Sequence, residues 1–156
     1  MIEVDIPGFR QLRLAHVVLD FNGTLACDGM LLPGMRARLE QLARAVTVHV
    51  ITGDTFGTAR EQLDELPCHV MILVSTAQDL AKRRIVKELG VEQVAAIGNG
   101  RNDCLMLEAA ALGIAVLGRE GTASATLLSA DLVVRSASAA FDVLLHPRRL
   151  IASLRR

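Results

Sequence analysis

Residues 16–29, HVVLDFNGTLACDG, carry a single carboxylate at the end of an apolar run. The run ends at Asp20 and Phe21, and the chain then turns through Asn22, Gly23 and Thr24 instead of continuing as a strand. A charge that closes a buried strand is unfavourable unless it is paired or used. The stretch therefore predicts a buried strand over residues 16–21 with a functional carboxylate at its carboxyl end.

Further short apolar runs recur along the chain and predict the rest of a sheet. Most of them are continuously apolar, as is typical of parallel strands that are covered on both faces. Segments of helical period lie between them. Repeated strand and helix units of this length predict an α/β fold, a doubly wound parallel sheet in three layers. The further predicted strands cover residues 46–51, 70–74, 94–97, 114–117 and 132–134.

Four helices are predicted between these strands, over residues 33–45, 58–66, 75–90 and 102–113. Pro33 suits the first turn of the first helix. Ser75 and Gln78 fit a capping box at the start of the third helix, and Gly90 fits its end. Residues 148–156, RRLIASLRR, predict an amphipathic helix at the C-terminus. The expected buried faces are Met35, Leu39 and Leu42 in the first helix, Ala81, Ile85 and Leu89 in the third, and Leu150, Ile151 and Leu154 in the last.

Composition limits the possible classes of protein. The chain has 156 residues, enough for a single domain over residues 1–156. Its 17 basic and 17 acidic side chains balance, which argues against a nucleic-acid or anionic-membrane partner. With no long apolar run and no leader pattern, a soluble, cytoplasmic protein is expected. The cysteines and histidines lack metal-ligand spacing and are expected to be structural: Cys27, Cys68, Cys104, His16, His49, His69 and His146.

Polar side chains follow three of the predicted strands, at the ends where ligands of such sheets bind. Asp20, Asn22 and Thr24 follow the first strand, and Lys82 lies in the helix after the third. The chain should bring these groups to one edge of the sheet although they are scattered in sequence. The further polar residues and glycines of this set are Thr52, Gly53 and Asp54 after the second strand, and Gly98, Asn99, Gly100, Asn102 and Asp103 after the fourth.

This set of side chains suits phosphoryl transfer. Asp20 can attack phosphorus and form an aspartyl phosphate. Thr52 as a donor and Lys82 as a point charge can stabilise the charge on the transferred group. Asp20 and Asp103 supply the carboxylates with which Mg²⁺ is usually held. Glycines at 23, 53, 98 and 100 allow the backbone to approach a phosphate closely.

Each of these groups alone also has a purely structural interpretation. Residues 52–54, TGD, can form a simple turn, and residues 98–103, GNGRND, can be a glycine turn with a helix cap at Asn102. Lys82 lies among other basic residues, as on a solvated helix face. The joint occurrence of these groups, each after its own strand, favours the functional interpretation.

The motifs resemble those of the haloacid dehalogenase-like phosphohydrolases. The four matching segments are DFNGTL (20–25), ITGD (51–54), Lys82 in KRRIVKELG (82–90), and GNGRND (98–103), in the family's order. The segments TGD and KRRIVKELG are most similar to the phosphorylation domain of P-type ATPases. The residue other than a carboxylate two positions after the nucleophile fits the same resemblance. The whole chain resembles the small soluble proteins described as P-type-ATPase-like.

The resemblance implies a role for each matching residue. Asp20 would be the nucleophile, and the backbone carbonyl of Asn22 a metal ligand. Thr52, Gly53 and Lys82 would hold the phosphoryl group. Asp103 together with Asn99 would complete a Mg²⁺ site. The chain resembles capless members of the family, whose open site suits a large phosphorylated substrate or a lid from a neighbouring subunit in a homo-oligomer.

Two positions depart from the family pattern. Asn22 stands where such phosphatases carry an aspartate that protonates the leaving group and then activates water, and an amide can do neither. The loss of a positioned acid/base slows a reaction by about 10²- to 10⁴-fold. Asn99 offers the metal only a neutral oxygen.

These departures leave two functions open. One is a Mg²⁺-dependent phosphatase that acts through an aspartyl phosphate with low intrinsic activity. The alternative is a noncatalytic module on the same fold that binds phosphate or metal. The presence of the nucleophile at Asp20 favours the enzyme, because a binding module has no need of it. A fragment of an ion pump is disfavoured, because the sequence contains no membrane segment and no separate nucleotide-binding domain.

Overall fold

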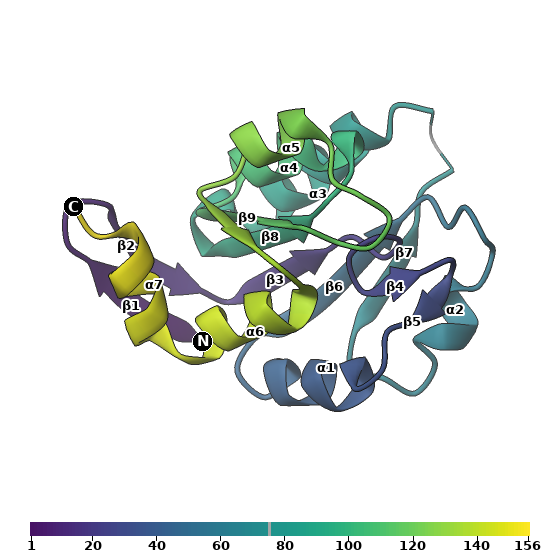
Figure 1. The fold of residues 1–156 in the computed structure, drawn as a ribbon, viewed down its shortest axis with the longest axis horizontal. Coiled ribbons are helices and arrows are strands. Elements are labelled where there is room, and N and C mark those ends of the chain that lie inside the picture. Colours follow the sequence, from purple (N-terminus) through teal and green to yellow (C-terminus); the bar gives the residue numbers. More distant parts are fainter. Residues whose placement is uncertain (75) are drawn as a thin grey trace.

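A central sheet of six parallel strands organises the chain (Figure 1). A computed structural model describes residues 1–74 and 76–156. The strand order is β10-β9-β8-β3-β6-β7, so β3 (His16–Leu19) lies inside the sheet between β8 (Val94–Gly98) and β6 (Thr47–Thr52). The outer strands are β7 (His69–Ile72), β9 (Leu112–Val116) and β10 (Leu132–Val134).

Both faces of this sheet are buried, as the continuous apolar strands predict. Val17 and Leu19 of β3 belong to the core on one face, and Val18 belongs to the core on the other, with no exposed surface on any of them. The helices α1 (Met35–Ala43) and α6 (Ala137–Leu145) cover the first face, while α3 (Gln78–Leu89) and α4 (Cys104–Ala109) cover the second (Figure 1). The three-layer, doubly wound α/β fold is therefore confirmed.

Two hairpins lie outside the central sheet. Strands β1 (Ile2–Ile6) and β2 (Arg10–Leu14) pair antiparallel and pack against the C-terminal helix α7 (Pro147–Leu154) (Figure 1). The short strands β4 (Ala26–Cys27) and β5 (Met30–Leu31) form a small hairpin directly after the turn that follows Asp20. The remaining short elements are α2 (Ala59–Gln62), α5 (Ser124–Leu128) and the 3₁₀ turns η1 (Val91–Gln93) and η2 (Arg101–Asp103).

Several predicted boundaries differ from the observed ones, for identifiable reasons. The first strand ends at Leu19 instead of 21, because the carbonyl of Phe21 accepts the backbone N–H groups of the following turn. The helix predicted over 58–66 covers only Ala59–Gln62, and Glu65 just beyond it has a left-handed φ of 61°. The helix predicted over 102–113 ends at Ala109, because residues 112–116 pair with β8 and β10 as β9.

The helix termini and buried faces also need correction. Pro33 lies before α1, because Gly34 adopts a left-handed φ of 76° at the N-cap. In α3 the fully buried residues are Lys82 and Val86, whereas Ala81, Ile85 and Leu89 are half-buried. The proposed capping box at Ser75 lies outside the described residues. The C-terminal helix is confirmed, with Leu150 buried.

None of the helices in the described part of the chain combines the length and apolarity that a bilayer span requires.

Candidate active site

A buried ion-pair network lies at the carboxyl end of β3. The ammonium of Lys82 donates to Asp20 Oδ1 at 2.6 Å and to Asp103 Oδ1 at 2.7 Å. The side chains of Lys82 and Asp103 are completely buried, and that of Asp20 is 10% exposed. The side chains come from the end of β3, from the second turn of α3 and from η2, so the fold unites residues up to 83 positions apart in sequence.

Asp103 is fixed by the loop that carries it. Its Oδ2 accepts the backbone N–H groups of Asn99 at 3.0 Å and Gly100 at 2.9 Å. A Cβ atom on Gly98 would overlap the Asp103 carboxyl group, so a glycine is required there. The GNGRND segment is therefore both a turn and a device that orients a carboxylate.

The electrostatics of the network favour an active role for Asp20. Burial, together with the nearby Asp103 carboxylate, raises the pKa of Asp20 to about 7, against the opposing effect of Lys82. Burial alone would lower the pKa of Lys82, but the two carboxylates and their hydrogen bonds raise it overall. Lys82 therefore remains charged at neutral pH. Strongly shifted ionisable groups in a cavity are typical of functional sites.

The turn after β6 presents Thr52 to the same site. Thr52 Oγ1 accepts the backbone N–H of Asp54 at 2.9 Å, so its own hydroxyl hydrogen remains available for donation. Asp54, at a left-handed φ of 50°, accepts the N–H groups of Thr58 and Ala59 at the start of α2. Asp54 thus has a structural role, whereas Thr52 faces the site.

A cavity of about 230 Å³ opens in front of these groups. Gln78 stands on its wall and accepts a hydrogen bond of 2.9 Å from Asn102. Asn99, also on the wall, accepts a hydrogen bond from Thr24 at 3.2 Å and donates to the carbonyl of Gly121 at 2.9 Å. The cavity is lined by Asp20, Asn22, Thr52, Gly53, Thr55, Gln78, Asn99, Gly100, Asn102 and Glu120.

The structure thus brings together the residues that the sequence singled out. Asp20, Asn22, Thr52, Gly53 and Asn99 line the cavity, and Lys82 and Asp103 lie directly behind it. The sequence reasoning missed Glu120, Gln78 and Thr55, which complete the wall. Glu120 comes from the loop after β9, and no local motif marks it.

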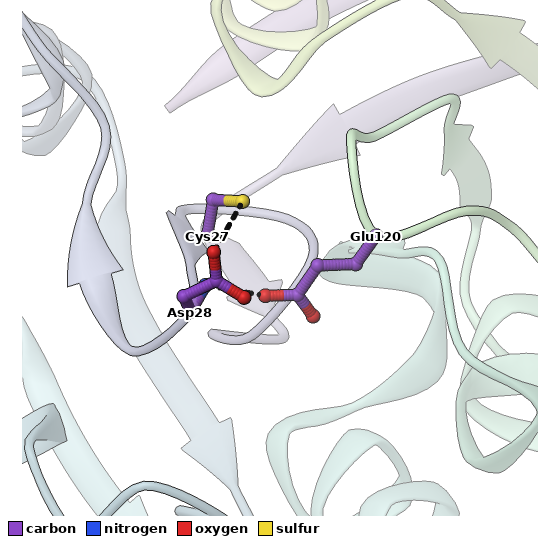
Figure 2. A group of neighbouring side chains, drawn as sticks. All are labelled: Cys27, Asp28 and Glu120. Atoms are coloured by element: carbon purple, nitrogen blue, oxygen red, sulfur yellow. Dashed lines mark hydrogen bonds between the residues drawn. The ribbon is translucent and has the colours of Figure 1, made fainter.

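Glu120 also joins the loop after β9 to the β4–β5 hairpin (Figure 2). Its Oε1 accepts the backbone N–H of Asp28 at 2.7 Å, and the thiol of Cys27 donates weakly to Asp28 at 3.8 Å. Burial and the two carboxylates raise the pKa of the Cys27 thiol. One ligand atom from each residue lies within 4.8 Å of the others, but both carboxylates are solvent-exposed, and exposed acidic groups commonly gather without a metal ion.

Three histidines gather on the face of the sheet that α3 covers. His16 Nδ1 and His49 Nε2 share a hydrogen bond of 3.2 Å, and the rings of His49 and His69 lie 5.2 Å apart between centroids. Burial, and then the two neighbouring rings, lower the pKa of His49 to about 4. The cluster lies toward the opposite ends of the strands from Asp20, and the sequence spacing gave no sign of it.

Comparison with known proteins places the chain in a family. A model of that family, described as haloacid dehalogenase-like hydrolase, matches residues 74–138. An uncharacterized protein of Methanocaldococcus jannaschii is 46% identical over 83 residues, which span 51% of this chain and 89% of that protein.

Two solved structures share the fold at lower sequence identity. The 3-deoxy-D-manno-octulosonate 8-phosphate phosphatase of Moraxella catarrhalis, in complex with magnesium, phosphate and KDO, is 17% identical with a TM-score of 0.72, over 89% of this chain and 90% of that one. The cobalt-bound form of the deoxy-D-mannose-octulosonate 8-phosphate phosphatase of Haemophilus influenzae is 19% identical with a TM-score of 0.72, over 90% and 92% of the two chains. The chain belongs to the haloacid dehalogenase-like hydrolase family.

Proposed function

We propose that this protein is a phosphatase that forms an aspartyl phosphate on Asp20 with the help of Mg²⁺ and turns over slowly. The observation that carries the proposal is the position of Asp20. Its carboxylate lines an open cavity, and its other side is held by the buried ammonium of Lys82. A carboxylate kept in place by a buried cation and open to a ligand is suited to nucleophilic attack.

The first chemical step uses groups that already surround the cavity. An oxygen of the Asp20 carboxylate attacks phosphorus, and the bond from phosphorus to the leaving group breaks. The Thr52 hydroxyl donates to a phosphoryl oxygen, and the charge of Lys82 offsets the negative charge that gathers around phosphorus. Gly53 lets the backbone come close to the phosphoryl group, and a Cβ there would collide with Gln78.

The second step, hydrolysis of the aspartyl phosphate, finds no base at the position two residues after the nucleophile. The side chain two residues after the nucleophile is the amide of Asn22, which cannot accept a proton from water at neutral pH. A positioned base accelerates such a step by about 10²- to 10⁴-fold in other enzymes, so we expect hydrolysis to be slower by about this factor. The phosphorylated protein should therefore accumulate during turnover.

The oxygen atoms on the cavity wall and directly behind it are of the kind that holds a Mg²⁺ ion. The carboxylates of Asp20 and Asp103, the side-chain oxygen of Asn99 and the backbone carbonyl of Asn22 are the hard donors that this ion prefers. Two carboxylates against one ammonium leave a net negative charge, which a divalent cation would neutralise. When bound, the ion would stabilise negative charge on the phosphoryl oxygens.

A phosphorylated substrate is part of the proposal. The two phosphatases with the same fold carry a phosphorylated sugar acid in their names, and one was solved with magnesium and phosphate bound. At this low sequence identity, the likeness supports the fold of this chain alone. Its substrate has to be derived from the cavity.

Trapping with beryllium fluoride tests this function. In crystals soaked with Mg²⁺ and beryllium fluoride, we expect the fluoride complex on an Asp20 oxygen, in contact with Thr52. The Asp20→Asn variant should bind none. Fluoride bound elsewhere, or no binding by a folded protein, would contradict the phosphatase and support the noncatalytic binding module.

A further inference from the structure

The side-chain oxygen of Asn22 is buried without a hydrogen-bond partner. Among residues 1–74 and 76–156, it is the single buried side-chain nitrogen or oxygen atom that has no hydrogen-bond partner. Buried polar atoms are otherwise nearly always paired, because an unpaired one loses its hydration without compensation. Asn22 lines the same cavity as Asp20. The unpaired oxygen is therefore a position at which a ligand can donate a hydrogen bond.

This atom sets two conditions on the leaving group. Asn22 cannot supply a proton, so the leaving group must depart without one from the protein. Its oxygen only accepts hydrogen bonds, so the leaving group should present a donor. Alkyl phosphates fail the first condition because they leave as alkoxides. Acyl and aryl phosphates fail the second because their leaving oxygen carries no hydrogen.

The charges on the cavity wall add a third condition. Glu120 lines the cavity together with Asp20, and none of the wall residues that the structure describes is a lysine or an arginine, since Lys82 is fully buried behind them. Lys82 and a bound Mg²⁺ would act on the phosphoryl group, so Glu120 is the further charged side chain of the wall, and its carboxylate disfavours leaving groups that depart as anions, such as acetate or phenolate. It favours a leaving group whose departing atom is positively charged before the bond breaks.

We propose that the substrates of this protein are N-phosphorylated amines, whose phosphorus–nitrogen bond places an N–H group against the side-chain oxygen of Asn22. This inference rests on the phosphatase proposed above. The nitrogen of such a compound is basic and carries its own proton when it reacts. It satisfies the proton, donor and charge conditions together.

The step balances without a general acid. An oxygen of the Asp20 carboxylate forms a bond to phosphorus while the phosphorus–nitrogen bond breaks. The electron pair of that bond goes to nitrogen, whose positive charge is cancelled as it leaves as a neutral amine. With phosphoramidate itself the products are ammonia and the aspartyl phosphate. No oxidant, reductant or further proton donor is needed.

The test compares two phosphoryl donors in the first step alone. The protein, loaded with Mg²⁺, is mixed with phosphoramidate or with acetyl phosphate, and the rate of phosphorylation is measured by rapid quench and intact-protein mass spectrometry. Asp20→Asn gives the background. The quantity of interest is the ratio of the two rates, because this ratio removes any effect of a substitution that is common to both donors.

Three variants separate hydrogen bonding and charge from structural effects. Asn22→Leu removes the acceptor at similar size, and the ratio of phosphoramidate to acetyl phosphate should fall about two- to tenfold, the effect of one hydrogen bond. Asn22→Asp retains an acceptor and should keep the ratio at least as high as in the wild type. Glu120→Gln, at an exposed position that should not affect folding, should also lower the ratio.

The outcomes distinguish this inference from the proposed function. If acetyl phosphate phosphorylates Asp20 but neither Asn22→Leu nor Glu120→Gln lowers the ratio, the inference about the substrate is wrong and the phosphatase proposal stands. If neither donor phosphorylates the folded wild-type protein, the phosphatase proposal fails and this inference fails with it. If Asn22→Leu does not fold, the result with Glu120→Gln decides.

Discussion

Replacing Lys82 with methionine should destabilise the metal-free protein by about 3–5 kcal/mol, the usual loss when one partner of a buried ion pair is removed. Methionine has a similar length and preserves the packing, so the loss reports the charge. The two carboxylate oxygens that bind the ammonium lie 2.6 and 2.7 Å from it, so they are at most about 5 Å apart. Without the ammonium, their repulsion is about 3 kcal/mol at an effective dielectric constant of about 20.

Urea denaturation in the presence of EDTA at pH 8 measures this loss. The matched control is Lys87→Met, which removes an exposed lysine from the same helix and should change the free energy of unfolding by no more than about 0.5 kcal/mol. Adding Asp103→Asn to Lys82→Met should recover part of the loss, because only one buried carboxylate then remains charged.

The same variant should show a characteristic pH dependence. Burial and Asp103 already raise the pKa of Asp20 to about 7, and the loss of Lys82 removes the main opposing influence. A protonated Asp20 no longer repels Asp103, and in the variant it takes up its proton at a higher pH than in the wild type, so the difference in unfolding free energy should shrink as the pH falls from 8 to 7 and level off below, where Asp20 of the wild type is protonated as well. If Lys82→Met loses no more stability than Lys87→Met at pH 8, the buried network does not hold the charges inferred here.

Three further predictions concern the acid/base position, the metal and the histidines. Asn22→Asp should raise the turnover of an alkyl phosphate by at least about tenfold and that of an acyl phosphate little, because only the alkoxide leaving group needs a proton. Steady-state kinetics at saturating Mg²⁺ measures both turnover rates, and equal gains for the two substrates would contradict this prediction. Asp103→Asn should weaken Mg²⁺ binding in calorimetry by more than about tenfold and by more than Asn99→Ala does, because it removes a charge, and the reverse order would contradict the assigned ligands. His49 has a lowered folded-state pKa of about 4, so stability should be full above pH 6.5 and fall toward pH 4, by at most about 1.4 kcal/mol per pH unit. His49→Gln should flatten this part of the curve of unfolding free energy against pH, and an unchanged slope would assign the loss to other groups.

The sequence was sufficient to predict the central sheet because its strands are buried on both faces. A strand such as β3 must be apolar at every position, and this continuous pattern is visible without any knowledge of its neighbours. The carboxyl ends of parallel strands meet at one edge, so the polar residues after each strand could be placed together. Asp20 and Thr52 were found in this way, and the structure places both on one cavity.

The N-terminal hairpin was missed although its signal is present. Residues 2–6, IEVDI, alternate buried and exposed side chains, as expected of a strand with one face in the core. Pro7 and Gly8 then form a turn before β2. The alternation points to a different kind of strand from those of the parallel sheet, and a search for continuous apolar runs passes over it.

Glu120 and the histidine cluster could not have been predicted from local patterns. Glu120 lies 100 positions after Asp20, in a loop whose path depends on how β9 and β10 pair. The contact between His16 and His49 depends on the register of β3 against β6, which no single segment encodes. Such side chains become neighbours only through tertiary structure.

Lys82 shows how a sequence pattern and a functional requirement conflict. The apolar residues Ala81, Ile85 and Leu89 suggest that their face of α3 is the buried one, and the basic residues around Lys82 suggest a solvated face. The structure buries Lys82 and Val86, one helical turn apart, most deeply of all in this helix. A lysine on the buried face of a helix is unfavourable unless buried negative charges compensate for its lost hydration. Asp20 and Asp103 supply those charges, and Lys82 in turn compensates for the lost hydration of both. The three residues therefore form one unit, in which the exposed edge of Asp20 is the part left free to react.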